Sequence, residues 1–358
     1  MLTAEDLKQL EEKGITLEMF KSQIERFKTG FPYLKIKSVA TVGNGITKLT
    51  ESEELLCIKL WDDYLNEGNK VMKFVPASGA ASRMFKNLFE FVSSGRNKPE
   101  TDFEKKFFEG IKKFAFYEAL DSACKAKYGD GIDTLINKGE FVNVVKCLIT
   151  DDGLNYGNMP KGLLQFHKTG LSIHTPVEEH LEEGAQYAKD KNNVVNLHFT
   201  VSPEHRKEFV NLIEKKVPEM EKEWGVKYNI SMSEQKSSTD TIAVTMDNEP
   251  YRENGRLLFR PAGHGALLEN LNEIDADVVF IKNIDNVVPR KLRDITVKYK
   301  KVIGGYLIYV QRKISEYIKL LESGKYDMAD VRDIISFMHD VLCTRYSETK
   351  QLEDSELA

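Results

Sequence analysis

The spacing of apolar residues changes several times between a helical and an extended period. Residues 3–29 repeat apolar positions at helical spacing, which predicts two amphipathic helices with Thr3 and Thr16 as N-caps. A third helix is expected from Glu51 to Leu65. The apolar run from Val71 to Gly79 ends in small residues, so it predicts a buried strand that enters a loop.

The middle of the chain first becomes helical and then alternates. From Ser82 to about Thr150 the pattern is helical and rich in Phe and Lys, and we expect a helical insertion over residues 87–157. Residues 163–167 have the pattern of a strand. Thr175 to Glu178 then forms a capping box with proline at the first helical position, which predicts the start of a helix.

Further strands are expected in the second half. Residues 194–202 are rich in β-formers, and a helix should follow from Ser202-Pro203 to about Trp224. The segments VKYNISMS, TIAVTM and RLLFRP have the composition of strands. A helix and the apolar strand VVFIKNID come next, and from Pro289 onward the chain should be mostly helical.

Strands that alternate with helices indicate an α/β protein with a mainly parallel, Rossmann-like sheet covered on both faces. The expected organisation has three parts. Residues 1–66 form an N-terminal helical segment, residues 67–288 an α/β domain that carries the insertion 87–157, and residues 289–358 a C-terminal helical segment.

Composition narrows the functional classes. The 358 residues are 41% hydrophobic and 30% charged, as in a globular protein, and the net charge of −5 argues against a general nucleic-acid binder. Four scattered cysteines do not suggest a disulfide framework or a zinc site. The N-terminus lacks the apolar core of a signal peptide, and no run reaches membrane-spanning length, so we expect a cytoplasmic protein without a membrane partner.

The segment from Arg260 to Asn286 carries the strongest chemical signal. It joins a loop, Gly263-His264-Gly265, through a helix-like run to a strand that ends at Asp285. In α/β proteins such a loop and the carboxyl end of a strand can meet at one crevice, where nucleotides and metals bind. A carboxylate that closes an apolar strand is costly unless it is solvated, hydrogen-bonded or bound to a metal. The alternative is that Asn-Ile-Asp-Asn only turns the chain.

Three other groups of residues could carry chemistry. Gly79 lies in a small-residue loop before a helix and is followed by Arg83, an arrangement that suits a phosphate but also serves simple packing. Lys161 sits in a turn before the expected strand, where a solvated lysine is the alternative. His167, His174 and His180 cluster in the sequence but lack the helical spacing of a metal site, so capping, packing and surface roles explain them more simply. His198 and His205 lie at the ends of the HFTVSPEH segment, where a structural role is the simpler interpretation and contact of one of them with a ligand at the strand's carboxyl end is the alternative.

Taken in order, these motifs resemble those of the nucleotide-sugar pyrophosphorylases, particularly the branch that makes UDP-glucose and UDP-N-acetylhexosamines. The small-residue loop that ends in Thr-Arg in that family is similar to residues 77–83, and Pro-Lys-Gly is matched by residues 160–162. A glutamine after a mid-chain strand corresponds to Gln235. The base loop Pro-x-Gly-His-Gly matches residues 261–265, and the strand ending in Asn-Ile-Asp-Asn matches residues 283–286.

The sequence departs from the family pattern in three places. Ser78 and Ala81 replace loop glycines, which adds bulk where the backbone should approach phosphate. About 75 residues separate Arg83 from Pro160, so Lys161 matches only across an insertion, and Lys86 is its rival. The family's later strands are not recognisable after Asn286, which leaves a fragment and a divergent branch as alternatives for a chain that ends in QLEDSELA.

The resemblance implies a nucleotide-diphospho-sugar transferase fold and a nucleotidyl transfer. A sugar 1-phosphate would attack the α-phosphorus of a nucleoside triphosphate, with UTP as the family's usual choice, and pyrophosphate would leave. Asp285 would hold Mg²⁺, while Arg83 and Lys161 would neutralise phosphate charge.

The nucleotide itself would be bound by two loops and a glutamine. The loop Ala77-Ser78-Gly79 would contact its phosphates, Gly263, His264 and Gly265 would lie against the base, and Gln235 would read a base edge. Two alternatives remain at this stage: a nucleotide- or nucleotide-sugar-binding protein without catalysis, and an α/β scaffold without a small-molecule site. The sequence gives no indication of the sugar or of the oligomeric state.

Overall fold

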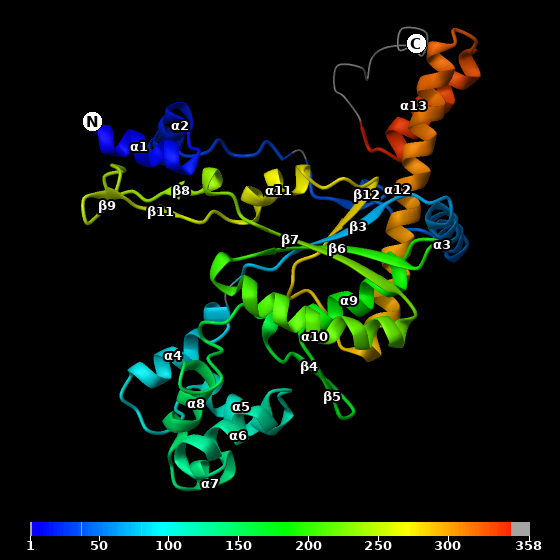
Figure 1. Ribbon diagram of the computed structural model, residues 1–358. Coiled ribbons are helices and arrows are strands. Elements are labelled where there is room, and N and C mark those ends of the chain that lie inside the picture. Colours follow the sequence, from blue (N-terminus) through cyan, green and yellow to red (C-terminus); the bar gives the residue numbers. More distant parts are fainter. Residues whose placement is uncertain (1, 37, 80, 345–358) are drawn as a thin grey trace. The chain divides into compact units, whose positions relative to one another are not determined.

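The computed structural model describes residues 2–36, 38–79 and 81–344, apart from the side chain of His264 (Figure 1). The described residues divide into two compact units. The first unit lies within residues 1–30 and 69–294, and the second lies within residues 31–68 and 295–358. The terminal run QLEDSELA, singled out in the sequence, falls outside the described residues.

The first unit contains most of the regular structure. Its helices are α1 (Ala4–Lys13), α2 (Leu17–Thr29), η1 (Ala81–Arg83), α4 (Lys86–Ser93), α5 (Asp102–Gly110), η2 (Ile111–Lys113), α6 (Tyr117–Tyr128), α7 (Ile132–Asn137), α8 (Phe141–Ile149), η3 (Lys161–Leu163), α9 (Pro176–Tyr187), η4 (Pro203–His205), α10 (Arg206–Trp224), η5 (Ser237–Thr239), η6 (His264–Leu267), α11 (Leu268–Asn272) and η7 (Arg290–Leu292). Its strands are β3 (Val71–Pro76), β4 (His167–Thr169), β5 (Ser172–His174), β6 (Val194–Val201), β7 (Lys227–Glu234), β8 (Thr241–Ile242), β9 (Arg252–Glu253), β10 (Arg256–Leu257), β11 (Phe259–Arg260) and β12 (Val278–Ile281).

The second unit contains β1 (Thr41–Val42), β2 (Gly45–Ile46), α3 (Glu51–Asn66) and α13 (Met328–Asp340). The long helix α12 (Arg293–Glu322) begins in the first unit and continues into the second. Gly304 and Gly305 let α12 approach α3 closely, because a β-carbon at either position would collide with Trp61 or with the backbone of Cys57. Trp61 is fully buried at this crossing.

A four-stranded parallel sheet forms the centre of the first unit. Its strand order is β12-β3-β6-β7, and every neighbouring pair is parallel. The α/β class and the Rossmann-like, parallel sheet expected from the sequence are therefore confirmed. The chain moves outward from β3 through β6 to β7, then returns to the other side of β3 as β12. The direction of winding thus reverses between β3 and β12.

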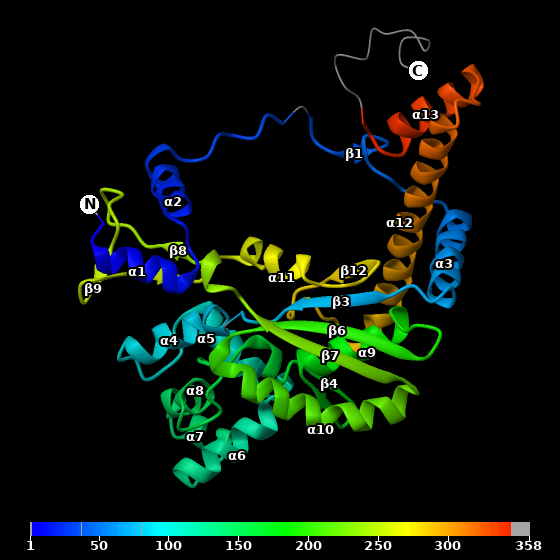
Figure 2. The same ribbon diagram turned by 45° about the horizontal axis from the view of Figure 1, so that its top comes forward.

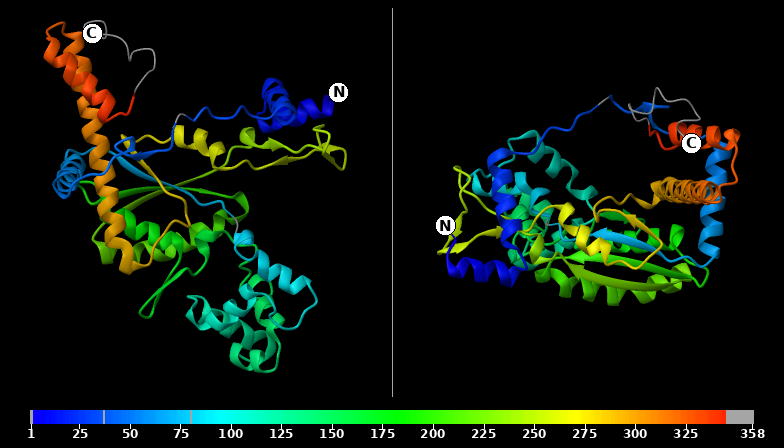
Figure 3. Two further views of the ribbon diagram at one scale, coloured as in Figure 1. Left: turned by 180° about the vertical axis from the view of Figure 1, so that it is seen from behind. Right: turned by 90° about the horizontal axis from the view of Figure 1, so that it is seen from above.

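The two faces of this sheet differ in character. Helices α9 and α10 cover one face, where Val75, Leu197 and Phe199 join them in a buried apolar core (Figure 1). On the opposite face His198 stacks on Phe74, and α11 lies on this side in every view (Figures 1 to 3). The expectation of full cover on both faces is wrong at the edge strand β7. Its polar residues, including Asn229, are exposed, because β7 alternates polar and apolar side chains.

The helices expected between residues 82 and 150 are present as α4 to α8. They enclose their own apolar core, which includes Phe85, Leu148 and Leu164. The strand expected over residues 163–167 is wrong, since η3 ends at Leu163 and β4 begins only at His167. The reason is that Leu163 packs against the sheet core while Leu164 enters the helical core, so the chain passes between two cores there.

The segments TIAVTM and RLLFRP do not join the main sheet. They contribute only the short strands β8, β10 and β11, which form antiparallel ribbons beside α1 and α2 (Figure 2). Ile242 and Leu257 are buried there in one cluster with Leu10 of α1, so the N-terminal helices, and not the main sheet, cover these apolar side chains. The turn between β9 and β10 contains Asn254 and Gly255, both with positive φ, which is the backbone of a tight hairpin.

The N-cap residues predicted from the sequence are confirmed at three helices. Thr3 and Thr16 cap α1 and α2, and Thr175 forms the expected capping box at α9. Among the helices of the described residues, none has the length and apolar character needed to cross a bilayer.

Candidate functional site

The carboxyl ends of the parallel strands bring the predicted site residues to one edge of the sheet. β3 runs into the Ala77–Gly79 loop, and β7 ends immediately before Gln235. The expected strand end at Asp285 is wrong, because β12 ends at Ile281 and Asp285 lies four residues later, in a turn closed by the bond from the Asn286 N–H to the Asn283 carbonyl at 3.0 Å. Open α/β sheets bind ligands outside this edge, at the point where the winding reverses. In this chain that point lies between β3 and β12.

Lys161 and Asp285 meet at this point. The Lys161 ammonium lies 2.7 Å from Asp285 Oδ2, and the two side chains are 23% and 35% exposed, so solvent reaches both. The backbone N–H of Lys161 also donates to the carbonyl of Gly79, at 3.1 Å, which ties it to the loop after β3. Gly162 makes this approach possible, because a β-carbon there would press on Phe209 and Ile284.

The loop after β3 is partly exposed. Ala77 is buried and its N–H still pairs with Thr200 of β6, Ser78 is half-buried, and Gly79 is exposed. Ala80 lies outside the described residues. Arg83, in η1, is exposed and makes no ion pair with another described residue, so the structure does not join it to Lys161 and Asp285.

Gln235 and the Gly-His-Gly loop meet at the other end of the edge. With its amide assigned so that both groups are satisfied, Gln235 donates to the carbonyl of Ala262 at 3.2 Å and accepts from the N–H of Ala262 at 3.0 Å. Asn270 donates to Ser233 Oγ and to the Glu234 carbonyl, both at 2.8 Å, which fixes α11 against the end of β7. The side chain of Gln235 therefore holds the loop, and reading a base edge would require these bonds to break.

Nothing within the described protein requires glycine at these loop positions. Four described glycines have neither a positive φ nor a neighbouring atom that a β-carbon would meet: Gly79, Gly110, Gly263 and Gly265. Three of the four belong to the two loops at the sheet edge. Their bare backbone faces open space, which is the condition for close approach of a ligand. The backbone of His264 begins η6, and its side chain lies outside the described part.

The edge offers one carboxylate for a metal. Within residues 2–36, 38–79 and 81–344 no group of three His, Cys, Asp or Glu side chains could hold a metal ion. Asp285 is reachable and follows a strand, so it fits a Mg²⁺ that arrives with a polyphosphate and takes most of its ligands from phosphate and water. It does not fit a metal cage built by the protein alone.

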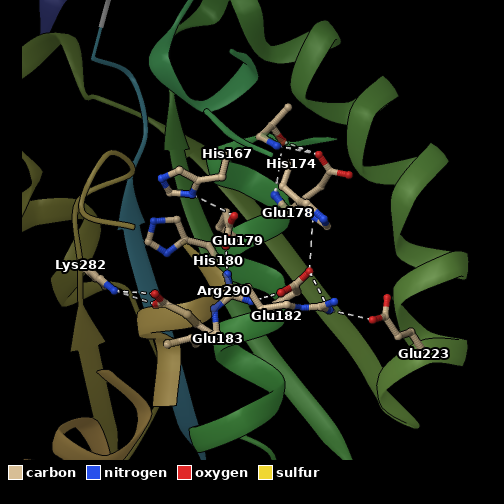
Figure 4. Close-up of polar contacts among 12 residues, drawn as sticks. His167, His174, Glu178, Glu179, His180, Glu182, Glu183, Glu223, Lys282 and Arg290 are labelled. Carbon is tan, nitrogen blue, oxygen red and sulfur yellow. Dashed lines mark hydrogen bonds and ion pairs between the residues drawn. The ribbon is translucent and has the colours of Figure 1, made fainter. Parts of the chain in front are cut away.

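A buried network of charged side chains lies on helix α9, next to the sheet (Figure 4). Helix α9 carries Glu178, Glu179, Glu182 and Glu183, each no more than 5% exposed. Each carboxylate has a basic partner. Lys216 pairs with Glu178, Arg293 pairs with both Glu179 and Glu182, Arg290 lies 3.5 Å from Glu182, and Lys73 and Lys282 share Glu183.

Part of this network positions the Asp285 segment. Lys282, directly after β12, binds both oxygens of Glu183 at 2.7 and 2.8 Å. Nε2 of His180 lies 3.2 Å from the carbonyl of Ile284, the residue before Asp285. Burial holds the pKa of His180 well below its usual value, so the ring is neutral and its Nε2–H donates to that carbonyl.

Burial and neighbouring charged groups determine which side chains of the network are ionised. Burial opposes ionisation of Glu183, but Lys73 and Lys282 outweigh it and hold the carboxyl's pKa below its usual value. Burial likewise lowers the pKa of His167, whose Nδ1 lies 3.0 Å from Glu179. The same cause lowers the pKa of His174, which faces His167 across the β4–β5 hairpin.

Most of this network was not predicted from the sequence. Capping, packing and surface roles were expected for the clustered His167, His174 and His180, and in the structure all three gather along α9. One signal in the sequence indicates the network, which is Lys73 in the middle of the apolar strand β3. His198 is bonded to Ser231 and Ser233 within the sheet, and the half-buried His205 lies in η4 and has no polar contact with the described residues of α9, so neither belongs to the network.

Comparison with known proteins identifies the family of this chain. No curated protein matches the chain, and no solved structure does. A family model described as a domain of unknown function, DUF4301, matches residues 3–358. Because that match spans nearly the whole chain, the chain belongs to the DUF4301 family.

Proposed function

We propose that this chain binds a nucleoside triphosphate, with UTP the first candidate, along the carboxyl edge of its four-stranded sheet, and transfers the nucleotidyl group to a sugar 1-phosphate. The observation that carries the proposal is the Lys161–Asp285 pair beside Gly79, at the point where the sheet reverses its winding. The resemblance of residues 71–286 to nucleotide-sugar pyrophosphorylases supports the same reaction.

The arrangement of the two loops suits an extended ligand. Three strand spacings separate β12 from β7, which corresponds to roughly 14 Å along the edge. The base would lie against the bare backbone of Gly263 and Gly265 near β7, and the phosphates would extend toward Gly79, Lys161 and Asp285. Gln235 would hold the base loop through Ala262.

The Lys161–Asp285 pair keeps the charges of the edge balanced before the ligand binds. Binding of a triphosphate with Mg²⁺ would break this ion pair. Asp285 would then ligate the ion, and Lys161 would turn to a phosphate oxygen. The ion, when bound, neutralises charge on the phosphates. Reactions of this kind depend on positioning and charge neutralisation and need no protein nucleophile. Arg83, exposed beside the loop, is the third cation and would close on the leaving pyrophosphate.

A second candidate is a nucleotide- or nucleotide-sugar-binding protein without catalysis. Two observations favour it. The side chains of Ser78 and Ala81 occupy positions where the family has loop glycines, and Arg83 is not held toward the other two charged residues.

A pyrophosphate-release assay separates the two candidates. Purified protein is incubated with Mg²⁺, each of the four ribonucleoside triphosphates and a set of sugar 1-phosphates. Release that needs both substrates supports the transferase. Binding of a triphosphate by calorimetry without any release favours the binding protein, and absence of both outcomes refutes the proposed site.

A further inference from the structure

Residues of α4 and α5, of the segment after α5 and of residues 156–166 line an open apolar cavity of about 430 Å³, a volume typical of small-molecule pockets. Its wall is dominated by aromatic rings, among them Phe85, Phe107, Phe114, Phe116 and Tyr156. The cavity is distinct from the sheet edge and has no place in the nucleotide proposal.

The aromatic wall is preformed by ring contacts. Phe114 stacks on Phe116 with ring centres 4.9 Å apart, and Phe116 meets Tyr156 edge-on at 5.7 Å. Phe107 lies 5.4 Å from Phe114, and Tyr156 lies 6.2 Å from Phe85. Rings locked against one another cannot rotate freely to fill the space between them, so the cavity persists without a ligand.

Two polar side chains interrupt the apolar wall. Lys106 of α5 lines the cavity, is exposed and makes no ion pair with another described residue, which is also true of its neighbour Lys105 outside the cavity. Gln165 has a buried Oε1 without a hydrogen-bond partner among the described residues. The Lys106 ammonium is the group that can orient an anionic head in this apolar pocket, because it only donates, whereas the Gln165 Oε1 is an acceptor and is left for a donor such as a bound water.

We propose that this cavity binds a small amphiphilic carboxylate, with its apolar chain between the rings and its carboxylate at Lys106. The exposed fractions of the surrounding side chains agree with this orientation. Met84, Phe103 and Phe114 are 44%, 40% and 37% exposed, so a chain that enters the cavity covers apolar surface that water now reaches. The inference is independent of the nucleotide proposal, because none of these residues belongs to the sheet edge.

The test is a calorimetric titration of the full chain with sodium hexanoate, octanoate and decanoate below their micelle concentrations. We expect one site and an affinity that rises about fourfold for each added methylene until the cavity is full. Lys106→Gln should weaken octanoate binding by roughly two- to fivefold, as expected for loss of a partly exposed charge pair. Lys105→Gln is the matched control, because Lys105 is the exposed neighbour on α5 and does not line the cavity.

A second variant tests the location. Met84→Trp places a large ring at the rim, where the side chain of Met84 is 44% exposed, and should abolish octanoate binding while leaving the circular dichroism unchanged. Absence of binding to wild type, affinity that does not depend on chain length, or equal affinity in the Met84→Trp variant would each overturn the inference.

Discussion

Lys161 and Asp285 stand 124 residues apart in the sequence, and their side chains are joined at 2.7 Å. The long insertion between Arg83 and Pro160 made the position of Lys161 the weakest step of the sequence interpretation. The structure places Lys161 beside Gly79 and Asp285 because Gly162 fits tightly between Phe209 and Ile284. Its rival Lys86 instead pairs with Glu90 on the surface of α4.

Asp285→Asn should remove Mg²⁺-dependent binding of the triphosphate and leave the fold intact, because Asn keeps the shape but lacks the charge that a hard cation requires. The matched control is Asp275→Asn. Asp275 also forms a 2.7 Å pair with a lysine, Lys70, but it lies before β12, at the opposite edge of the sheet. Calorimetry with UTP should distinguish the two variants by at least tenfold in affinity. Equal affinity for both would remove the metal role of Asp285.

Gly265→Val should block the nucleotide without destabilising the protein, since a β-carbon at Gly265 meets no protein atom within 4 Å. Gly110→Val is the control, because Gly110 has the same freedom but lies in α5. The measurement is UTP affinity together with the melting temperature. If Gly265→Val binds as the wild type does, the base-loop assignment is wrong.

Glu183→Gln should strongly destabilise the first unit. The change leaves Lys73 and Lys282 without their shared carboxylate, and breaking a buried ion pair by removing one partner typically costs about 3–5 kcal/mol. The two tryptophans allow each unit to be followed separately, because Trp224 belongs to the first and Trp61 to the second. Urea unfolding in a Trp61→Phe background therefore reports the first unit.

Glu90→Gln is the control for this experiment, since Glu90 and Lys86 form an exposed pair that should contribute little. A Glu183→Gln variant as stable as the wild type would show that the network does not hold the sheet edge.

Stability of the first unit should rise with pH between about 5 and 7. Burial lowers the pKa of His180 well below the unfolded value of 6.5, so the unfolded chain binds more protons in this range. The stabilisation is present above pH 6.5 and is lost as the pH falls, at a slope of up to about 1.4 kcal/mol per pH unit for one histidine. His180→Gln should flatten the dependence of the unfolding free energy on pH. An unchanged slope would contradict a buried neutral ring.

Gly305→Ala should destabilise the second unit, although alanine favours helices over glycine. The β-carbon would collide with the backbone of Cys57, and overpacking of this kind costs about 1–3 kcal/mol. The fluorescence of Trp61 in a Trp224→Phe background measures the change. Ser315→Ala, at an exposed position of α12, should instead leave stability unchanged or raise it slightly.

Some parts of the fold were readable in the sequence because their signals are local. Threonine caps, the capping box at Thr175 and the apolar strands at Val71 and Val194 depend on neighbouring residues, and all of them are confirmed. The return of β12 to the side of β3 depends on long-range pairing. No local pattern encodes it, although it decides where the site lies.

The errors have a different physical cause. The TIAVTM and RLLFRP segments have strand composition, but Ile242 and Leu257 are buried by the N-terminal helices instead of by the sheet. The buried network on α9 was missed because four glutamates in a helix normally indicate a solvated face, and only tertiary packing brings lysine and arginine to them. The residues of the candidate site could be predicted from the sequence, but their grouping could not. In the structure one cluster contains Lys161 and Asp285, and the other contains Gln235 and the Gly-His-Gly loop.

The most direct test of the central claim is calorimetric titration of the wild-type chain with UTP in the presence of Mg²⁺. We expect one site per chain, with affinity reduced at least tenfold in Lys161→Gln because the phosphates lose a cation at the sheet edge. Absence of binding by UTP and by the other three ribonucleoside triphosphates, in a protein shown to be folded, would contradict it.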